Sequence, residues 1–484
     1  MEWLAGTDYD LAREVLQRGT AAIYLIAFLS TLNQFPALLG EHGLMPVPVF
    51  LRTVYARRQP TLFRWHYSDR LLRAVAIVGA VVSATLVLGL PQLGPAWVPL
   101  VAFLVIWLLY LSIVNVGQTF YGFGWESLLL EAGFMVAFLG SSRVATPITV
   151  IFLIRWLVFR LEFGAGMIKM RGDRSWRDLT ALYYHHETQP MPNPLSRFAH
   201  LLPKWMHRAE VLGNHFAQLI VPFFLFAPQP VASIAAAIVI LTQLWLVVTG
   251  NFAWLNVLTI VLAFSAVGDP AIRLVIPAMP ADGGPAGVPL WFAVIVLAMT
   301  AFTIVLSWWP AKNLVARRQL MNASFNRWHL VNAYGAFGSV TKERYEVIVE
   351  GTDSDDPADE TRWREYGFKG KPGDPTRVPR QFAPYHLRLD WLMWFLALGA
   401  DDGWFRTFLL RLLEADRPTL RMLRLDPFDG ERPRWVRARL FHYRFATREE
   451  RRTDRVWWMR QELNTLAGPF TLADRDRDRD RAEQ

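Results

Sequence analysis

The stretch Val231–Thr249 reads VASIAAAIVILTQLWLVVT and contains no charged residue. The uncharged run continues beyond this stretch, because no Asp, Glu, Lys or Arg occurs from Val231 to Val267. A helix of about 20 predominantly apolar residues is long enough to cross the hydrocarbon core of a bilayer. The stretch therefore predicts a transmembrane helix, and the chain is expected to be an integral membrane protein.

Charged and apolar residues are segregated along the whole chain of 484 residues. Hydrophobic residues make up 53% of the sequence and charged residues 19%, and the mean hydropathy is +0.20. Other parts are dense in charge, such as Asp474–Arg481, where Asp and Arg alternate. Long uncharged runs separated by charged segments are typical of membrane proteins that cross the bilayer several times.

Apolar runs of about the length of a transmembrane helix recur through the first two thirds of the sequence and predict about nine spans. The fourth, fifth and eighth runs are the least regular, because they are short or carry charge. The nine runs are Ala21–Leu39, Ala74–Leu90, Trp97–Val116, Leu128–Leu139, Ile148–Met170, Val211–Ala227, Val231–Thr249, Leu255–Val267 and Val288–Trp309.

The character of the sequence changes after Pro310. Tyr345–Gly351 alternates between apolar and polar residues as a half-buried strand does, and Trp363–Phe368 and Arg437–Phe445 alternate less cleanly. Leu389–Leu398 is mostly apolar but too short to cross a bilayer, which favours a buried helix.

The predicted fold class is a polytopic α-helical membrane protein with a C-terminal, β-rich soluble domain. Residues 1–319 are expected to form the membrane domain, which includes an ordered polar loop at 171–205. Residues 320–465 are expected to form the soluble domain, and residues 466–484 a disordered, charged tail.

The fifth predicted span carries four ionisable residues. Arg155, Glu162 and Lys169 are spaced by seven, which on a helix returns to nearly the same face, and Arg160 lies off this stripe. Each such group costs about 2.5–3.5 kcal/mol at the centre of a spanning helix on insertion scales. These side chains are therefore expected to face protein or water and to need partners.

The nearest acidic residues in an earlier span are Glu126 and Glu131. Two interpretations of this intramembrane polar cluster follow. One is a polar cavity or substrate site within the bundle, and the other is a set of structural ion pairs that hold the helices together. Ion pairs are favoured, because buried pairs also form where only packing is at stake.

Common catalytic and metal-binding patterns do not occur in this sequence, and no catalytic residue is predicted. The chain has no cysteine, which excludes disulfides and thiolate metal sites. His185, His186 and Glu187 are adjacent, and further histidines follow at 200, 207 and 215, but none of them has the i, i+4 spacing of a helical metal site. We therefore expect neither a metal nor another cofactor. The net charge of +9 is assigned to the ends of membrane helices and not to nucleic-acid binding.

The segment Arg155–Pro194 reads RWLVFRLEFGAGMIKMRGDRSWRDLTALYYHHETQPMPNP. It resembles the defining segment of the lipase maturation factor family, and the resemblance continues in order over nearly the whole chain. The further blocks are Asn214–Phe216, Pro222–Phe224, Gly250–Phe252, Val331–Gly338, Thr341–Arg344, Pro384–His386, Leu389–Trp394 and Trp457–Trp458.

The resemblance singles out two groups of residues. In the polar loop they are Trp176, Arg177, Asp178, His185, His186 and Glu187, and in the soluble domain they are Asn332, Tyr334, Gly335, Asp390 and Trp391. In animal members, cysteines stand near the positions of Ser175 and Ala181 in this chain. The resemblance therefore implies no thiol chemistry here.

The resemblance implies a membrane-anchored factor that helps secreted lipases or related hydrolases to fold or assemble. Animal members lie in the endoplasmic-reticulum membrane, and their C-terminal domain faces the lumen and engages the lipase. Abundant Ala and Arg with few Lys fit a high-GC bacterial genome, which would place this protein in the inner membrane. The expected partners are secreted hydrolases and the lipid bilayer, with no nucleic acid.

Two other functions are open. The fold is similar, by resemblance, to the membrane part of vitamin K-dependent carboxylases, so an enzyme that uses the polar cavity around Arg155, Arg160 and Glu162 is the alternative. A small-solute transporter is less favoured, because no internal repeat is evident.

The topology receives conflicting indications. Six arginines follow the first span, at 52, 57, 58, 64, 70 and 73, and the positive-inside rule assigns them to the cytoplasm. With nine spans, this assignment also puts the soluble domain in the cytoplasm. The resemblance implies the opposite side for that domain, and we follow the resemblance.

Overall fold

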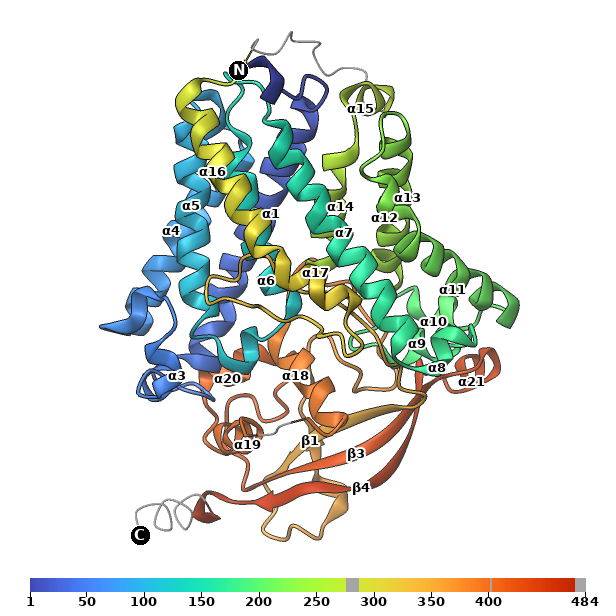
Figure 1. Cartoon of the computed structure of the whole chain (residues 1–484). Coiled ribbons are helices and arrows are strands. Elements are labelled where there is room, and N and C mark those ends of the chain that lie inside the picture. Colours follow the sequence, from blue (N-terminus) through green and yellow to red (C-terminus); the bar gives the residue numbers. More distant parts are fainter. Residues whose placement is uncertain (276–286, 401–402, 475–484) are drawn as a thin grey trace.

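The computed structural model describes residues 1–275, 287–400 and 403–474, and it consists of a helical bundle with a small sheet at one end (Figure 1). Within these ranges, five helices are long and apolar enough to cross a membrane. They are α1 (Asp10–Leu39), α4 (Asp69–Val87), α5 (Trp97–Val114), α13 (Val231–Thr249) and the continuous stretch Leu290–Val315, which comprises α16 (Leu290–Leu306) and α17 (Trp308–Val315). The prediction of a helical membrane domain is confirmed.

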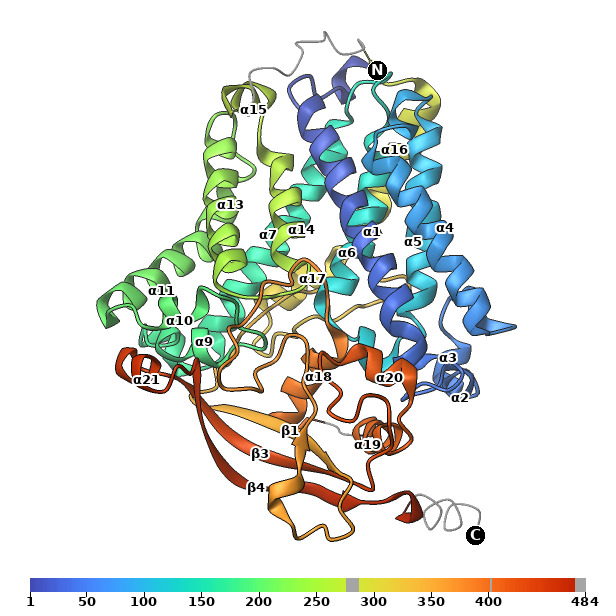
Figure 2. The same cartoon turned by 180° about the vertical axis from the view of Figure 1, so that it is seen from behind.

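Further helices lie next to these five in both views of the bundle, and one of them, at residues 204–219, points obliquely outward at the end near the C-terminal domain (Figures 1 and 2). They correspond to the fourth, fifth, sixth and eighth predicted spans, but they are short, charged or interrupted. They are α6 (Gly124–Val136), α7 (Ile148–Arg171), α11 (Lys204–Leu219) with α12 (Val221–Phe224), and α14 (Leu255–Ala263). The count of nine spans stays a prediction, because only five helices of the described residues meet the length and apolarity of a span.

The remaining short helices lie in the connections of the bundle. The predicted polar loop at 171–205 contains three of them, which agrees with the expectation of short helical turns. The short helices are α2 (Val47–Phe50), α3 (Val54–Arg57), α8 (Arg174–Arg177), α9 (Leu182–Thr188), α10 (Ser196–His200) and α15 (Asp269–Val275).

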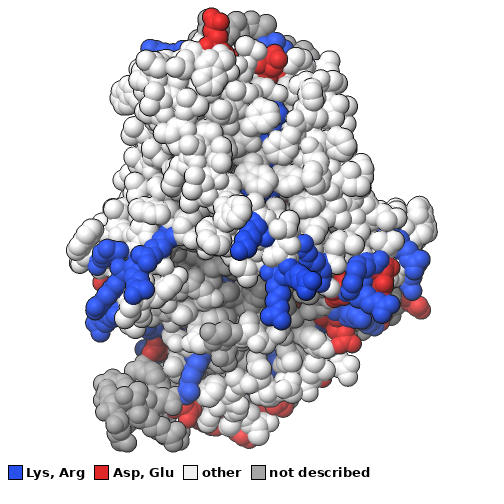
Figure 3. Space-filling model, viewed as in Figure 1, with Lys and Arg blue, Asp and Glu red and all other residues white. Residues whose placement is uncertain are grey.

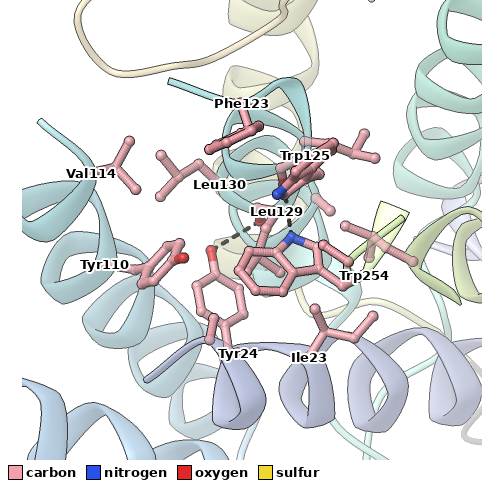
Figure 4. Packing of buried hydrophobic residues seen from close by; sticks show 14 of the residues in the cluster. Ile23, Tyr24, Tyr110, Val114, Phe123, Trp125, Leu129, Leu130 and Trp254 are labelled. Atoms are coloured by element: carbon pink, nitrogen blue, oxygen red, sulfur yellow. Dashed lines mark hydrogen bonds between the residues drawn. The ribbon is translucent and has the colours of Figure 1, made fainter. Parts of the chain in front are cut away.

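Aromatic side chains fill the centre of the bundle, where α1, α5, α6 and α14 meet (Figure 4). The Tyr24 hydroxyl donates a hydrogen bond to the Leu129 carbonyl at 3.0 Å, and the Trp254 indole donates one to the Trp125 carbonyl, also at 3.0 Å. Buried tyrosine and tryptophan usually find such a partner for their polar atom. These hydrogen bonds fix the rings between the helices.

Basic side chains form a belt across one end of the bundle, beside the C-terminal domain, on the face shown in Figure 3. The flank of the bundle in the same view is mostly uncharged, as a surface in contact with lipid should be. Lys and Arg gather where membrane helices end, since their charged groups stay in water. The belt therefore marks one boundary of the membrane.

The C-terminal domain contains a four-stranded antiparallel sheet in the order β2-β1-β3-β4. In its register Val347 lies opposite Leu440, and Phe441 lies opposite Glu462. The strands are β1 (Arg344–Thr352), β2 (Arg364–Glu365), β3 (Trp435–Phe445) and β4 (Trp458–Phe470). The helices of the domain are α18 (Arg388–Ala397), α19 (Phe405–Leu413), α20 (Arg417–Met422) and α21 (Arg448–Thr453).

The strand predictions at Tyr345–Gly351 and Arg437–Phe445 agree with β1 and β3, whereas Trp363–Phe368 contains only the two residues of β2. The predicted disordered tail from 466 differs from the structure at its start. Residues up to Phe470 belong to β4, because Ala467 and Phe470 pair with Ala438 and Val436 of β3. The alternating Arg and Asp from 475 on lie outside the described residues.

The domain packs directly on the bundle through α18. Trp391 of α18 contacts Trp125 at the start of α6, with ring centroids 4.7 Å apart, and Phe123 lies against both rings. One buried hydrophobic cluster extends from the bundle into this domain. The predicted domain boundary at residue 320 stays a prediction. The parts on either side of it share one hydrophobic core.

Candidate functional site: buried charges where the bundle meets the C-terminal domain

Arg160 and Glu131 form a buried ion pair between α7 and α6. The segment just before the sheet completes it, because the Asn332 backbone N–H donates to the Glu131 carboxylate at 2.8 Å and the Tyr334 hydroxyl donates to it at 2.7 Å. Arg160 also donates to the Asn332 carbonyl at 2.6 Å. A buried pair is stable only when its remaining hydrogen-bonding groups are satisfied. The C-terminal segment supplies partners for both Glu131 and Arg160, and the Arg160 Nε alone forms no hydrogen bond within the described residues.

A second buried pair joins Glu126 of α6 to Arg388 of α18 at 2.5 Å. Arg388 also donates to the Phe120 carbonyl at 2.8 Å, and the Tyr110 hydroxyl donates to the Glu126 carboxylate. His386 lies 3.5 Å from the same carboxylate. Burial, and then the neighbouring Arg388 guanidinium, lower the pKa of His386 to about 3, so its ring is neutral.

Glu162 and Lys169 belong to a third polar group, in which glutamine side chains bridge four helices. Gln243 donates to Glu162 at 2.6 Å and Gln218 donates to it at 3.2 Å, while Lys169 donates to Gln218 at 2.8 Å. Asn256 of α14 extends the group by donating to Gln243 at 2.7 Å. Glu162 and Lys169 are thus linked through amides.

Arg155 lies apart from these groups. Its Nε donates to the Ser265 carbonyl at 3.0 Å, and its guanidinium lies over the Tyr9 and Phe152 rings. The spacing of seven therefore did not place Arg155, Glu162 and Lys169 in one network, because different helices pack against successive turns of α7. Arg160, which lies off the stripe, holds the ion pair instead.

The residues of the polar loop contact the segments around the sheet. The Trp176 indole donates to the Phe337 carbonyl at 2.8 Å, and Glu187 accepts the Phe445 backbone N–H at 2.6 Å. Arg177 and Asp178 are exposed, and Asp178 pairs with Arg174 at 3.0 Å. Part of this loop thus fastens the bundle to the sheet.

Asp390 and Gly335 contact residues near them and take no part in the buried ion pairs described above. The Asp390 carboxylate accepts the backbone N–H groups of Gly370 at 2.6 Å and Lys371 at 3.0 Å. Burial raises the pKa of Asp390, while these hydrogen bonds oppose the shift. Gly335 is close to Ile168 of α7, where a side chain would crowd the helix.

A further buried charge network was not predicted. Arg344 donates to the carbonyls of Glu187 and Gln189 at 2.9 and 2.5 Å, and it pairs with Glu346 at 2.5 Å. Lys371 lies 2.9 Å from the same Glu346 side chain. Glu346 occupies an alternating strand pattern that places its side chain on one face, but the sequence does not show that this face is covered.

Two histidine side chains of the bundle lie close to one glutamate. His186 of α9 lies 3.6 Å from Glu210 of α11, and His207 lies 3.9 Å from it. His185 turns to Phe252 and Phe337 instead. The histidines have no i, i+4 spacing in the sequence, and this group combines an i, i+3 pair on one helix, His207 and Glu210, with His186 of another.

A cavity of about 400 Å³ lies beside this histidine group, with largely apolar walls. Its polar lining includes Lys169, His185, Gln218 and Gln243. A cavity of this size is at the lower end of the range for small-molecule sites.

These features define a polytopic membrane protein whose C-terminal β domain is fixed to the bundle by buried ion pairs. Residues 11–274 match the lipase maturation factor transmembrane domain, and residues 330–468 match the lipase maturation factor C-terminal domain. The chain belongs to the lipase maturation factor family.

Similarity to individual relatives covers almost the whole chain. This chain is 38% identical to lipase maturation factor 1 of Bos taurus, over 97% of this chain and 90% of the relative. It is 39% identical to lipase maturation factor 1 of Homo sapiens, over 96% of this chain and 88% of the relative. Identity to lipase maturation factor 2 of Homo sapiens is 27%, over 96% and 83%. Among solved structures there is no match.

Proposed function

We propose that this protein is a membrane-anchored maturation factor that assists the folding or assembly of secreted lipases or related hydrolases. The observation that carries the proposal is the near full-length similarity to lipase maturation factor 1, which includes both the bundle and the C-terminal domain. The buried ion pairs support it, because they hold the domain in one position at the membrane surface.

We place the client-binding surface on β4. This strand is at the edge of the sheet, and residues 461–466 are exposed on both faces. Leu463 and Leu466 are 47% and 42% exposed in this segment. Edge strands offer unpaired backbone groups to another chain, and exposed apolar residues add contact area. Both features suit a partner that has not completed its own fold.

Substituting Asp for both Leu463 and Leu466 should lower the active fraction of the secreted client enzyme without lowering its synthesis. Charges on an apolar contact surface disfavour binding, while exposed positions tolerate them in the free protein. The measurement is specific hydrolase activity in a deletion strain complemented with each variant. The matched control is Val378→Asp, at a position of the same domain with similar exposure. Full activity with the double variant would exclude β4 as the client surface.

Substitution tests this proposal better than truncation does. Removing the chain from residue 320 on would delete Asn332, Tyr334 and Arg388 together with the sheet. Because these residues contact charges buried in the bundle, truncation would disturb the membrane part as well. A loss of activity would then have two explanations.

We further propose that α6, α7, α11 with α12, and α14 cross the membrane together with the five long helices, giving nine crossings. The amino terminus and the sheet lie at opposite ends of the bundle, as an odd number of crossings requires (Figure 1). The family resemblance favours the exoplasmic side for the sheet. A bacterial source, which the composition indicates, would make this membrane the inner membrane and this side the periplasm.

A reporter that is active only in the periplasm, fused after Gln484, should therefore be active. The six arginines after α1 and the basic belt beside the domain favour the opposite orientation by the positive-inside rule. The same reporter fused before Met1 is the control and should be inactive. The reverse pattern would place the domain in the cytoplasm and exclude contact with secreted clients.

The alternative function is an enzyme that uses the cavity beside α11 and α13. The specific observation in its favour is the buried Lys169 at the cavity wall, in contact with Gln218 and Asn214. An enzyme should lose its effect on Lys169→Met even when the sheet is intact, and it should tolerate the two Asp substitutions in β4. A maturation factor should show the opposite sensitivity.

A further inference from the structure

His186, His207 and Glu210 bring three metal-ligating side chains together outside the ion pairs described above. One ligand atom from each lies within 4.8 Å of the other two. Both histidine side chains are 2% exposed, and that of Glu210 is 21% exposed. The group joins α9 to α11 at the end of the bundle that faces the C-terminal domain (Figure 2).

Three nitrogen atoms of these two histidines lack a hydrogen-bond partner within the described residues. Both ring nitrogens of His186 and the Nδ1 of His207 are buried and form no hydrogen bond in the part of the chain that the structure describes, although Glu210 lies 3.6 and 3.9 Å from two of them. Buried polar atoms in native proteins are nearly always paired, so each exception calls for a specific explanation. A bound cation would satisfy the nitrogens that face Glu210.

Neighbouring groups orient two of the three side chains. The Nε2–H of His207 donates to the His200 carbonyl at 3.2 Å, so in the neutral ring the Nδ1 carries the free lone pair. The Trp245 indole donates to one Glu210 oxygen at 2.5 Å. Metal-ligating histidines and carboxylates are usually held in this way by a second hydrogen bond.

We propose that His186, His207 and Glu210 bind a divalent transition metal ion, with Zn²⁺ as the favoured ion. Two imidazoles and one carboxylate are a zinc ligand set that leaves a fourth position free. Tetrahedral zinc with bonds of about 2.0–2.2 Å needs ligand atoms roughly 3.4 Å apart. The His186 Nε2 and the His207 Nδ1 lie 3.6 and 3.9 Å from different oxygens of Glu210, and one ligand atom from each residue lies within 4.8 Å of the other two, so side-chain rotations are needed to complete the site.

The fourth position has space on one side. His186 and Glu210 line the 400 Å³ cavity, and apolar residues of α13 such as Ile238, Leu241 and Leu246 also line it. A metal at this wall takes a water molecule or another oxygen donor from the cavity. The site thus has the open coordination typical of functional zinc and differs from closed structural sites.

Zinc titration tests the site directly. The full-length chain is purified in detergent on a tag free of histidine, stripped with a chelator and titrated with ZnCl₂ against a chromophoric competitor. We expect one high-affinity ion per chain and a rise in the melting temperature, since a ligand that binds only the folded state stabilises it. Co²⁺ in place of zinc should give the intense visible absorption of a tetrahedral site.

Variants identify the ligands. His186→Ala and Glu210→Gln should each weaken zinc binding by at least tenfold and abolish the Co²⁺ absorption. Glu210→Gln keeps an oxygen acceptor for Trp245, so this variant still tests whether the group binds zinc if His186→Ala does not fold. His215→Gln is the control, because this histidine is on the same helix but bonds to the Trp176 carbonyl at 3.0 Å.

Two results would overturn the proposal. One is a parent chain that binds no stoichiometric zinc, which would leave the group as an arrangement of histidine and glutamate only. The other is an equal loss of zinc in His215→Gln and Glu210→Gln. These measurements involve no client, so they succeed or fail independently of the proposed maturation function.

Discussion

Arg160→Leu is expected to cost about 3–5 kcal/mol of folding free energy, the scale found when one partner of a buried ion pair is removed. The substitution leaves the Glu131 carboxylate without its counter-charge in the bundle. It also removes the donor to the Asn332 carbonyl, which joins the bundle to the segment before the sheet. Because marginal membrane proteins have little stability to lose, we expect sharply reduced folded protein.

Arg155→Leu is the matched control for this prediction. Arg155 is on the same helix and equally buried, but its hydrogen-bond partner is the neutral Ser265 carbonyl. Its loss should cost only about 1–3 kcal/mol, the desolvation penalty of an unsatisfied acceptor. Unfolding of both variants in mixed micelles, with an increasing fraction of SDS, compares the two. Equal losses would show that the acid at position 131 contributes nothing beyond a hydrogen bond.

The membrane part was predictable from sequence because a span has a strong local signal. Val231–Thr249 is uncharged and long enough by itself, and the same is true of Trp97–Val114. The β1 strand was predictable for a similar reason, since Tyr345–Gly351 alternates. In β4 the exposed segment has no buried face, so its side chains carry no alternation, and the strand was missed.

The partners of the buried charges could not be predicted, because they come from distant parts of the chain. Glu126 and Arg388 are 262 positions apart, and Glu131 and Asn332 are 201 apart. A spacing of seven residues shows which side chains share a face of one helix. The residues that pair with those side chains depend on which other helix packs against each turn. The resemblance to the family marked Asn332 and Tyr334, but only the structure places them at Glu131.

The histidine group shows the same limit at shorter range. His207 and Glu210 are one turn apart on α11, and His186 reaches them from α9. The spacing of His207 and Glu210 is unremarkable in sequence, and the contact depends on how the polar loop folds against α11. His185 and His186 are adjacent in the sequence, but His185 contacts Phe252 and His186 lies beside Glu210.

The pair of Glu126 and Arg388 should reveal how strongly the domain is fixed to the bundle. Either Glu126→Leu or Arg388→Leu leaves one unpaired charge in a fully buried position, so each should cost about 3–5 kcal/mol. Single variants should also release the C-terminal domain more readily to protease, because Arg388 contacts Phe120 and Tyr110 of the bundle as well.

The double variant Glu126→Leu/Arg388→Leu should be more stable than either single variant. Replacing both members of a buried pair with apolar residues is often neutral or stabilising, so Glu126→Leu should destabilise the parent yet stabilise the Arg388→Leu background. The exposed pair Arg364 and Asp353, 2.9 Å apart, is the control and should show a coupling below about 1 kcal/mol. Unfolding in mixed micelles gives the four free energies of each cycle. If the two effects at Glu126 and Arg388 simply add, the charges do not act as a pair, and the position of the domain depends on its other contacts with the bundle, such as the packing of Trp391 against Trp125.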